Sequence, residues 1–195
     1  MRATRALAVV LLAGCFVSGC GSGGPKIPDE NLGRLVLHAA DLPRSFAPFY
    51  NGPQAKIDVT GPARSDPTRF GRKGGWVARF HRGGGRGTPG PLVVVSSVDV
   101  FGSSGNANDD LDAYKADFDR QAAVATRTLH PPRIGDETVG VTYVQPGPLA
   151  IRFFTIAWRY RNATAAVTAE GFGNRIRLGD ALKLARRQQR RLAGS

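Results

Sequence analysis

The sequence predicts an α+β fold, and two observations lead to this prediction. In several segments apolar side chains alternate with polar ones, which is the pattern of half-buried strands. Two longer segments instead place their apolar residues at helical spacing. We therefore expect a two-layer sandwich in which a mostly antiparallel sheet of about five to six strands is backed by two amphipathic helices, with a short helix near the N-terminus.

The first segment of the chain has the features of an export signal. Residues 1–5 are basic, residues 6–17 are apolar, and the apolar part is too short to span a bilayer. Small residues then lead to Cys20, an order that resembles the cleavage site of a bacterial lipoprotein precursor. We expect residues 1–19 to be a signal peptide and Cys20 to carry a lipid at the outer face of the cell membrane.

Two other interpretations of this segment stay open. Leu12-Ala13-Gly14-Cys15 matches the lipoprotein pattern more closely, which would place the lipid on Cys15. We favour Cys20 because the polar, glycine-rich residues that follow it form a flexible tether. An ordinary secretory signal is the third interpretation. In each case both cysteines precede residue 21, so the remaining domain can form no internal disulfide.

The composition indicates one basic domain. The formal net charge is +12, which is typical of proteins with anionic partners. Export argues against nucleic acid, and anionic lipid or a phosphate-bearing cell-wall polymer remains. A solvated basic surface without a specific partner is the alternative. We interpret residues 20–30 as the tether and residues 31–195 as a single α+β domain.

The N-terminal part of that domain is predicted to be irregular. Residues 31–42 form the short helix, because Leu32, Leu35 and Val36 share a helical face and Pro43 ends it. Residues 45–57 form an irregular strand, and residues 61–75 form a loop.

A hairpin and a helix are expected next. Residues 76–81 and 92–101 alternate in strand fashion and are joined by a glycine-rich loop. Residues 102–108 form a turn, and Asn108 caps an amphipathic helix that extends to about residue 126.

In the C-terminal half we expect one strand, then a second hairpin and a second helix. Strands are expected at residues 138–144, 150–161 and 163–171, and a helix follows at residues 177–192. Trp158 is placed in the middle of the second of these strands, on the face that the helices cover.

No motif assigns catalytic residues, a metal or a cofactor. The nucleophile elbow Gly-x-Ser-x-Gly is absent, and the three histidines, His38, His81 and His130, lie far apart without a local acidic partner.

One polar group remains as a candidate site. By strand alternation Arg79, His81, Arg159 and Arg161 all lie on the solvated face of the sheet. If their strands are neighbours, these residues form a basic face that can hold a carboxylate or phosphate. The alternative is an outer face that is only solvated.

Three short motifs resemble a known group of proteins. They are Asp41-Leu42-Pro43, Ile134-Gly135-Asp136-Glu137-Thr138-Val139 and Trp158-Arg159-Tyr160-Arg161-Asn162-Ala163. They are similar to segments of small actinobacterial lipoproteins and of the extracellular sensor domains of actinobacterial serine/threonine kinases. Such sensor domains commonly carry disulfides, whereas the domain expected after Cys20 has no pair of cysteines to form one. The resemblance implies a non-enzymatic ligand-binding or cell-wall-associated role.

The leading hypothesis is therefore a lipid-anchored binding or accessory domain at the cell envelope. An exported hydrolase and a structural tether between membrane and wall are the alternatives.

Overall fold

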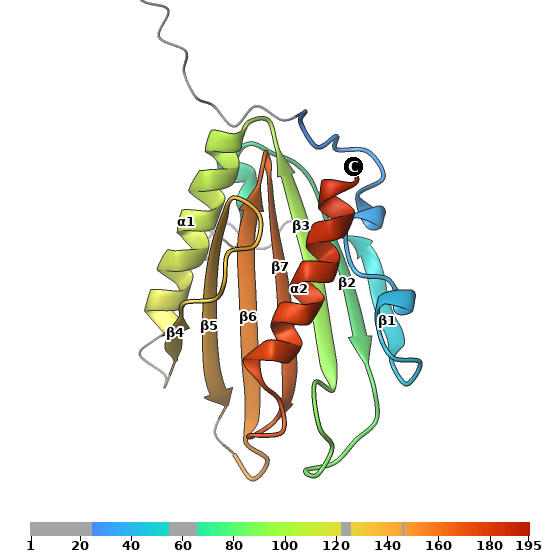
Figure 1. Cartoon of the computed structure of the whole chain (residues 1–195). Helices are drawn as coiled ribbons and strands as arrows, with labels where there is room; N and C mark the ends of the chain where they lie inside the picture. The colour runs from blue at the N-terminus through green and yellow to red at the C-terminus, as the bar shows by residue number, and fades with distance from the viewer. Residues whose placement is uncertain (1–24, 55–65, 122–125, 146) are drawn as a thin grey trace, which may run out of the picture.

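The computed structural model describes residues 25–54, 66–121, 126–145 and 147–195 (Figure 1). These residues form one antiparallel sheet with two long helices and several 3₁₀ turns. The strands are β1 (Ala47–Pro53), β2 (Arg72–His81), β3 (Val93–Phe101), β4 (Arg127–Leu129), β5 (Glu137–Gln145), β6 (Ile151–Tyr160) and β7 (Ala163–Phe172). The helices are α1 (Ser104–Gln121) and α2 (Leu178–Ala193), and the 3₁₀ turns are η1 (Leu32–Arg34), η2 (Ala39–Asp41) and η4 (Pro67–Phe70).

The sheet confirms the α+β class but has more strands than expected. Its order is β1-β2-β3-β7-β6-β5-β4, and the described residues contain seven strands rather than five to six. The strand missing from the prediction is β4, which has three residues and pairs with β5 at the edge. Strand β2 also begins at Arg72, inside the segment that was expected to be a loop.

The two helices lie on opposite faces of the sheet, which corrects the predicted two-layer arrangement. Helix α2 packs on the face that carries Ile156 and Val167, and we call this the α2 face. Helix α1 packs on Ala157 and Ala166, which are the next residues along the same strands. Successive side chains of a strand point to opposite faces, so the sheet lies between the helices.

The α2 face holds most of the buried apolar side chains. Trp158 lies there with no exposed surface, as predicted, and its indole Nε1 donates to Gln189 Oε1 of α2 over 2.7 Å. Ser96 on β3 donates to Gln188 Oε1 of the same helix over 2.8 Å. These two bonds pair the buried indole N–H of Trp158 and the buried hydroxyl of Ser96 with side chains of α2, and they fix α2 against the sheet.

Helix α1 begins earlier than the sequence suggested. Its first residue is Ser104, and Ser103 Oγ accepts a hydrogen bond from the backbone N of Asn106 over 3.2 Å. A serine one position before a helix, accepting from the third helical N–H, is a helix cap. The segment 102–108 is therefore not a turn, and Asn108 does not cap the helix.

The expected N-terminal helix is replaced by η1 and η2. Between them Leu35, Val36 and Leu37 are all buried on the α2 face, which no single helical stripe would allow. The backbone N of Leu37 donates to Ser96 Oγ over 2.9 Å. The chain turns at Leu35 and bends at Val36, so neither helical nor strand periodicity applies, and all three consecutive side chains reach the core.

Candidate functional site

The four residues of the predicted basic face do not come together. Arg79 and His81 lie on β2, Arg159 lies on β6, and β3 and β7 separate these strands. Pairing places Arg79 level with Thr155 of β6, whereas Arg159 is level with Gly75 of β2. The two arginines are thus offset by about 13 Å along the strands and about 14 Å across them. They share a face but form no common patch, and anion binding by them stays a prediction.

Arg159 and Arg161 are instead organised by one carboxylate. Asp136 Oδ2 accepts from Arg159 Nη1 over 3.0 Å and from the backbone N of Arg161 over 2.8 Å. Arg161 has a left-handed φ of 56° in the turn between β6 and β7, and its guanidinium lies 4.8 Å from the ring centroid of Tyr160. These contacts order one end of the sheet.

Arg79 and His81 lie beside two exposed aromatic rings on the edge strand β1. Phe49 is 51% exposed and Tyr50 is 43% exposed. The pairing of β1 with β2 shifts between Pro48 and Tyr50, so Phe49 is an extra residue in the ladder. Such a bulge redirects side chains. The Phe49 ring lies 5.3 Å from that of His81, and Arg79 lies 5.7 Å from the ring of Tyr50.

The same face of the sheet continues as a half-exposed surface beyond the reach of α1. We call it the open face, and it consists of Arg79, Val93, Val95, Tyr143, Phe153, Thr155, Thr168 and Glu170. The rings of Tyr143 and Phe153 are stacked at 4.4 Å with an interplanar angle of 4°. The hydroxyls of Thr155 and Thr168 are 3.0 Å apart. The open face therefore combines an aromatic pair with a row of hydrogen-bonding groups.

Glu170 gives the open face its electrostatic character. Partial burial raises the pKa of this carboxyl, and the positive charge of Arg79 opposes the rise. Burial also raises the pKa of Tyr143, and the charge of Glu170 adds to this effect. A carboxylate that is incompletely hydrated, and that receives no hydrogen bond from the described side chains, is stabilised when a ligand donates a hydrogen bond to it. Sequence reasoning missed Glu170, although its position two residues after Thr168 on an alternating strand indicated its face.

A hollow of about 1040 Å³ lies between η1 and the start of β2. Trp76, Asn51, His38 and Arg72 contribute to its lining, and Trp76 Nε1 donates to Asn51 Oδ1 over 2.7 Å. Arg72 is paired with the fully buried Asp99 at 3.0 Å. The hollow ends at Gln54 and Thr68, which flank residues outside the described ranges, so we base no site on its shape.

The histidines occupy three separate environments. His38 Nε2 lies 2.9 Å from the carbonyl of Gly33, His81 contacts Phe49, and His130 lies in the exposed segment after β4. Within the described ranges no three His, Cys, Asp or Glu side chains are grouped as metal ligands. The predicted lipid-bearing residues Cys20 and Cys15 lie outside the described residues.

Comparison with known proteins supports the fold. No protein-family model and no curated protein matches the chain in sequence. Its structure is similar to that of the extracellular domain of PknH from Mycobacterium tuberculosis, with a TM-score of 0.64 and 14% sequence identity. The match covers 89% of this chain and 100% of that domain. The resemblance to kinase sensor domains, stated above from three short motifs, is confirmed at the level of the fold.

No helix in the described part of the chain is sufficiently long and apolar to cross a bilayer.

Proposed function

We propose that this chain is an exported, lipid-anchored domain of the cell envelope that binds a ligand on its open face without catalysing a reaction. The export-type segment and Cys20 support this localisation, and the fold shared with an extracellular domain agrees with it. The open face carries the proposal, because it leaves an aromatic pair and a partly buried carboxylate accessible on a sheet that is otherwise well covered.

The chemistry of the open face favours a ligand with both apolar and hydrogen-bonding surface. Glu170 accepts hydrogen bonds, Arg79 donates them, and the threonine pair does both. The rings of Tyr143 and Phe153 offer apolar contact beside these groups. A sugar ring has this combination of hydroxyl groups and apolar C–H surface, and we therefore assign the ligand to the class of envelope carbohydrates.

The ligand class is tested with soluble oligomers of N-acetylglucosamine, measured by isothermal titration calorimetry on the full chain. Phe153→Ala and Glu170→Gln are each expected to weaken binding by about tenfold or more, since each removes a contact to the ligand. Leu149→Ala, a change of an exposed apolar residue in the β5–β6 loop, is the control and should leave binding unchanged.

Two results would contradict this assignment. If the parent chain binds no such oligomer, the ligand class is wrong. If the open-face variants bind as tightly as the control, the site lies elsewhere, and the hollow beside Trp76 is the next place to examine.

The anchor is tested separately by expressing Cys20→Ala and Cys15→Ala variants. An acyl chain buried in the bilayer contributes about 0.8 kcal/mol per CH₂ to the free energy of membrane binding, so loss of the lipid should move the protein out of the membrane fraction. We expect this for Cys20→Ala only, together with loss of metabolic labelling by a palmitate analogue. Release by Cys15→Ala alone would transfer the lipid to Cys15.

A further inference from the structure

The two helices on opposite faces of the sheet carry opposite charge. Helix α1 contains five aspartates against one lysine and one arginine, a formal charge of −3. Helix α2 contains one aspartate against one lysine and four arginines, a formal charge of +4. The sheet separates these two helices, so the domain is electrostatically polarised across its thickness.

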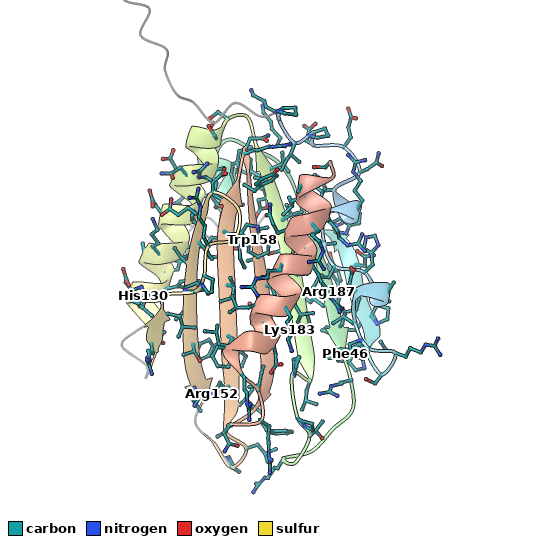
Figure 2. The ribbon with its side chains drawn as sticks, in the orientation of Figure 1. Phe46, His130, Arg152, Trp158, Lys183 and Arg187 are labelled. Carbon is teal, nitrogen blue, oxygen red and sulfur yellow. The ribbon has the colours of Figure 1, made fainter. Side chains whose placement is uncertain are left out.

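The positive charge of α2 is concentrated on the side that faces solvent. We call this row the cationic stripe, and it consists of the exposed residues Lys183, Arg186, Arg187 and Arg190. Their offsets of three and four place them along one side of the helix. Figure 2 shows Lys183 and Arg187 along α2, with Phe46 beside the helix on the β1 side.

Most of the stripe lacks acidic partners within the chain. Arg187 donates to the backbone carbonyl of Asp41, and the neighbouring Arg191 pairs with the carboxylate of Asp41 at 2.7 Å. Among the described residues, Lys183, Arg186 and Arg190 have no acidic partner. Like charges four residues apart, such as Arg186 and Arg190, destabilise a helix. An external anionic surface would offset this cost.

The start of the described chain lies near the C-terminal end of α2. The backbone N of Ile27 donates to Asn162 Oδ1 over 2.7 Å, and Lys26 Nζ donates to the carbonyl of Gly102 over 2.8 Å. Figure 1 shows this segment and the C-terminal end of α2 at the same end of the sheet. A lipid on Cys20 would be joined to this end by residues 21–25, which span at most about 17 Å when extended.

We propose that the cationic stripe of α2 lies on the anionic headgroups of the membrane leaflet that holds the lipid anchor. This inference rests on the proposed anchor at Cys20, which makes the leaflet the nearest anionic surface and keeps it at a high effective concentration. The acidic helix α1 is repelled from the same leaflet. The domain thus rests on its α2 face, and the open face, which shares its side of the sheet with α1, is directed away from the membrane toward its ligand.

The first experiment measures binding of the full chain to vesicles without any lipid anchor. Cys15→Ser and Cys20→Ser are present in every sample, so failure of the anchor assignment cannot affect the result. The vesicles contain phosphatidylcholine alone or phosphatidylcholine with phosphatidylglycerol. The test variant combines Lys183→Gln, Arg186→Gln and Arg190→Gln, and the control combines Lys73→Gln, Arg127→Gln and Arg175→Gln, exposed cations on β2, on β4 and before α2.

We expect the parent and the control to prefer the anionic vesicles at low salt. The test variant should lose roughly 100-fold in affinity for them, since each Lys or Arg near an anionic surface contributes about fivefold. Salt should weaken the binding of the parent, because exposed charges are screened over about 10 Å at 0.1 M ionic strength. Equal affinity of test and control variants would overturn the proposal. So would binding of the parent to inorganic polyphosphate with none to anionic vesicles, which would indicate a wall polymer.

The second experiment maps the contact on the unmutated protein, reconstituted with the lipid that the cell attaches. An amine-reactive reagent modifies exposed lysines, and mass spectrometry compares Lys183 on α2 with Lys73 on β2, both of which are exposed in the structure. In anionic vesicles the modification of Lys183 should slow several-fold relative to Lys73, and in phosphatidylcholine vesicles it should not. An unchanged ratio in both vesicle types would overturn the orientation even if the protein is lipidated as proposed.

Discussion

The two faces of the sheet are covered to different extents, and this difference separates the face that supplies most of the core from the face that we propose binds a ligand. The α2 face is covered by α2, by the N-terminal segment and by many apolar side chains, including Trp158 and Phe80. The other face has one helix and a small buried cluster, namely Leu111, Phe118, Val141, Ala157 and Ala166. The remainder of that face is the open face. Because the α2 face contributes most of the core, the chain keeps part of its other face accessible.

The largest expected effect concerns the well-covered α2 face. Trp158→Ala removes a fully buried ring and its hydrogen bond to Gln189, and we expect the free energy of unfolding to fall by about 3–5 kcal/mol. Chemical denaturation followed by circular dichroism measures this loss. A near-neutral effect would show that α2 and the N-terminal segment can close the space, and that the α2 face is not the main source of stability.

A core substitution on the α1 side should lower the free energy of unfolding by less. Leu111 is fully buried in the cluster that contains Ala157 and Ala166, but this cluster has only four other buried residues. We expect Leu111→Ala to cost about 2–3 kcal/mol, because the edge of a small cluster can relax into the space. A loss as large as that of Trp158→Ala would contradict the unequal division of the core between the two faces.

This division was only partly predictable from the sequence. Alternation on β6 correctly placed Trp158 inward, and alternation on β5 correctly gave an apolar face to Val139 and Val141. Which apolar faces point the same way depends on pairing, and Val139 is level with Ala157 rather than with Trp158. The run Ala163-Thr164-Ala165-Ala166-Val167 at the start of β7, which is apolar except for Thr164, was the available signal. Such runs are typical of strands that are buried on both faces.

The candidate site was half predicted for the same reason. Alternation identified Arg79 and His81 as lying on a solvated face, and Arg79 does belong to the open face, with His81 beside it. It also placed Arg159 on that face, but strand order and register are not encoded in the period of a single strand. The neighbours that make the open face, such as Phe153 and Glu170, come from β6 and β7. The approach of Glu170 to Arg79, and its place level with Phe153, arise only in the folded sheet.

A third change examines the far end of this face, where Arg159 is held away from the open face. Asp136→Ala leaves the guanidinium of Arg159 and the backbone N of Arg161 without their acceptor. We expect a loss of about 1–2 kcal/mol in the free energy of unfolding, measured by thermal or chemical denaturation. Asp112→Ala, which removes an exposed carboxylate from α1, is the control and should cost less than about 1 kcal/mol. Equal effects would mean that Asp136 has no organising role.

The smallest effect, and the only one of opposite sign, is expected on the open face itself. Because burial raises the pKa of Glu170, the folded protein binds the proton of this carboxyl more tightly than the unfolded chain does. The stabilisation from this group is complete below the unfolded pKa of about 4.3 and is lost as the pH rises through the higher folded pKa. At neutral pH the charged carboxylate therefore lowers the free energy of unfolding slightly. A binding site that keeps an incompletely hydrated acceptor for its ligand has this property.

Glu170→Gln removes the charge and should raise the free energy of unfolding at neutral pH by about 0.5 kcal/mol or less. The gain should shrink toward zero as the pH falls well below about 4, where the parent carboxyl is protonated in both states. Denaturant titrations of both proteins across this pH range measure the difference. A variant that is less stable than the parent at neutral pH would show that the attraction of Glu170 to Arg79 outweighs the cost of burial. The carboxylate would then stabilise the open face and would not be an unsatisfied acceptor for a ligand.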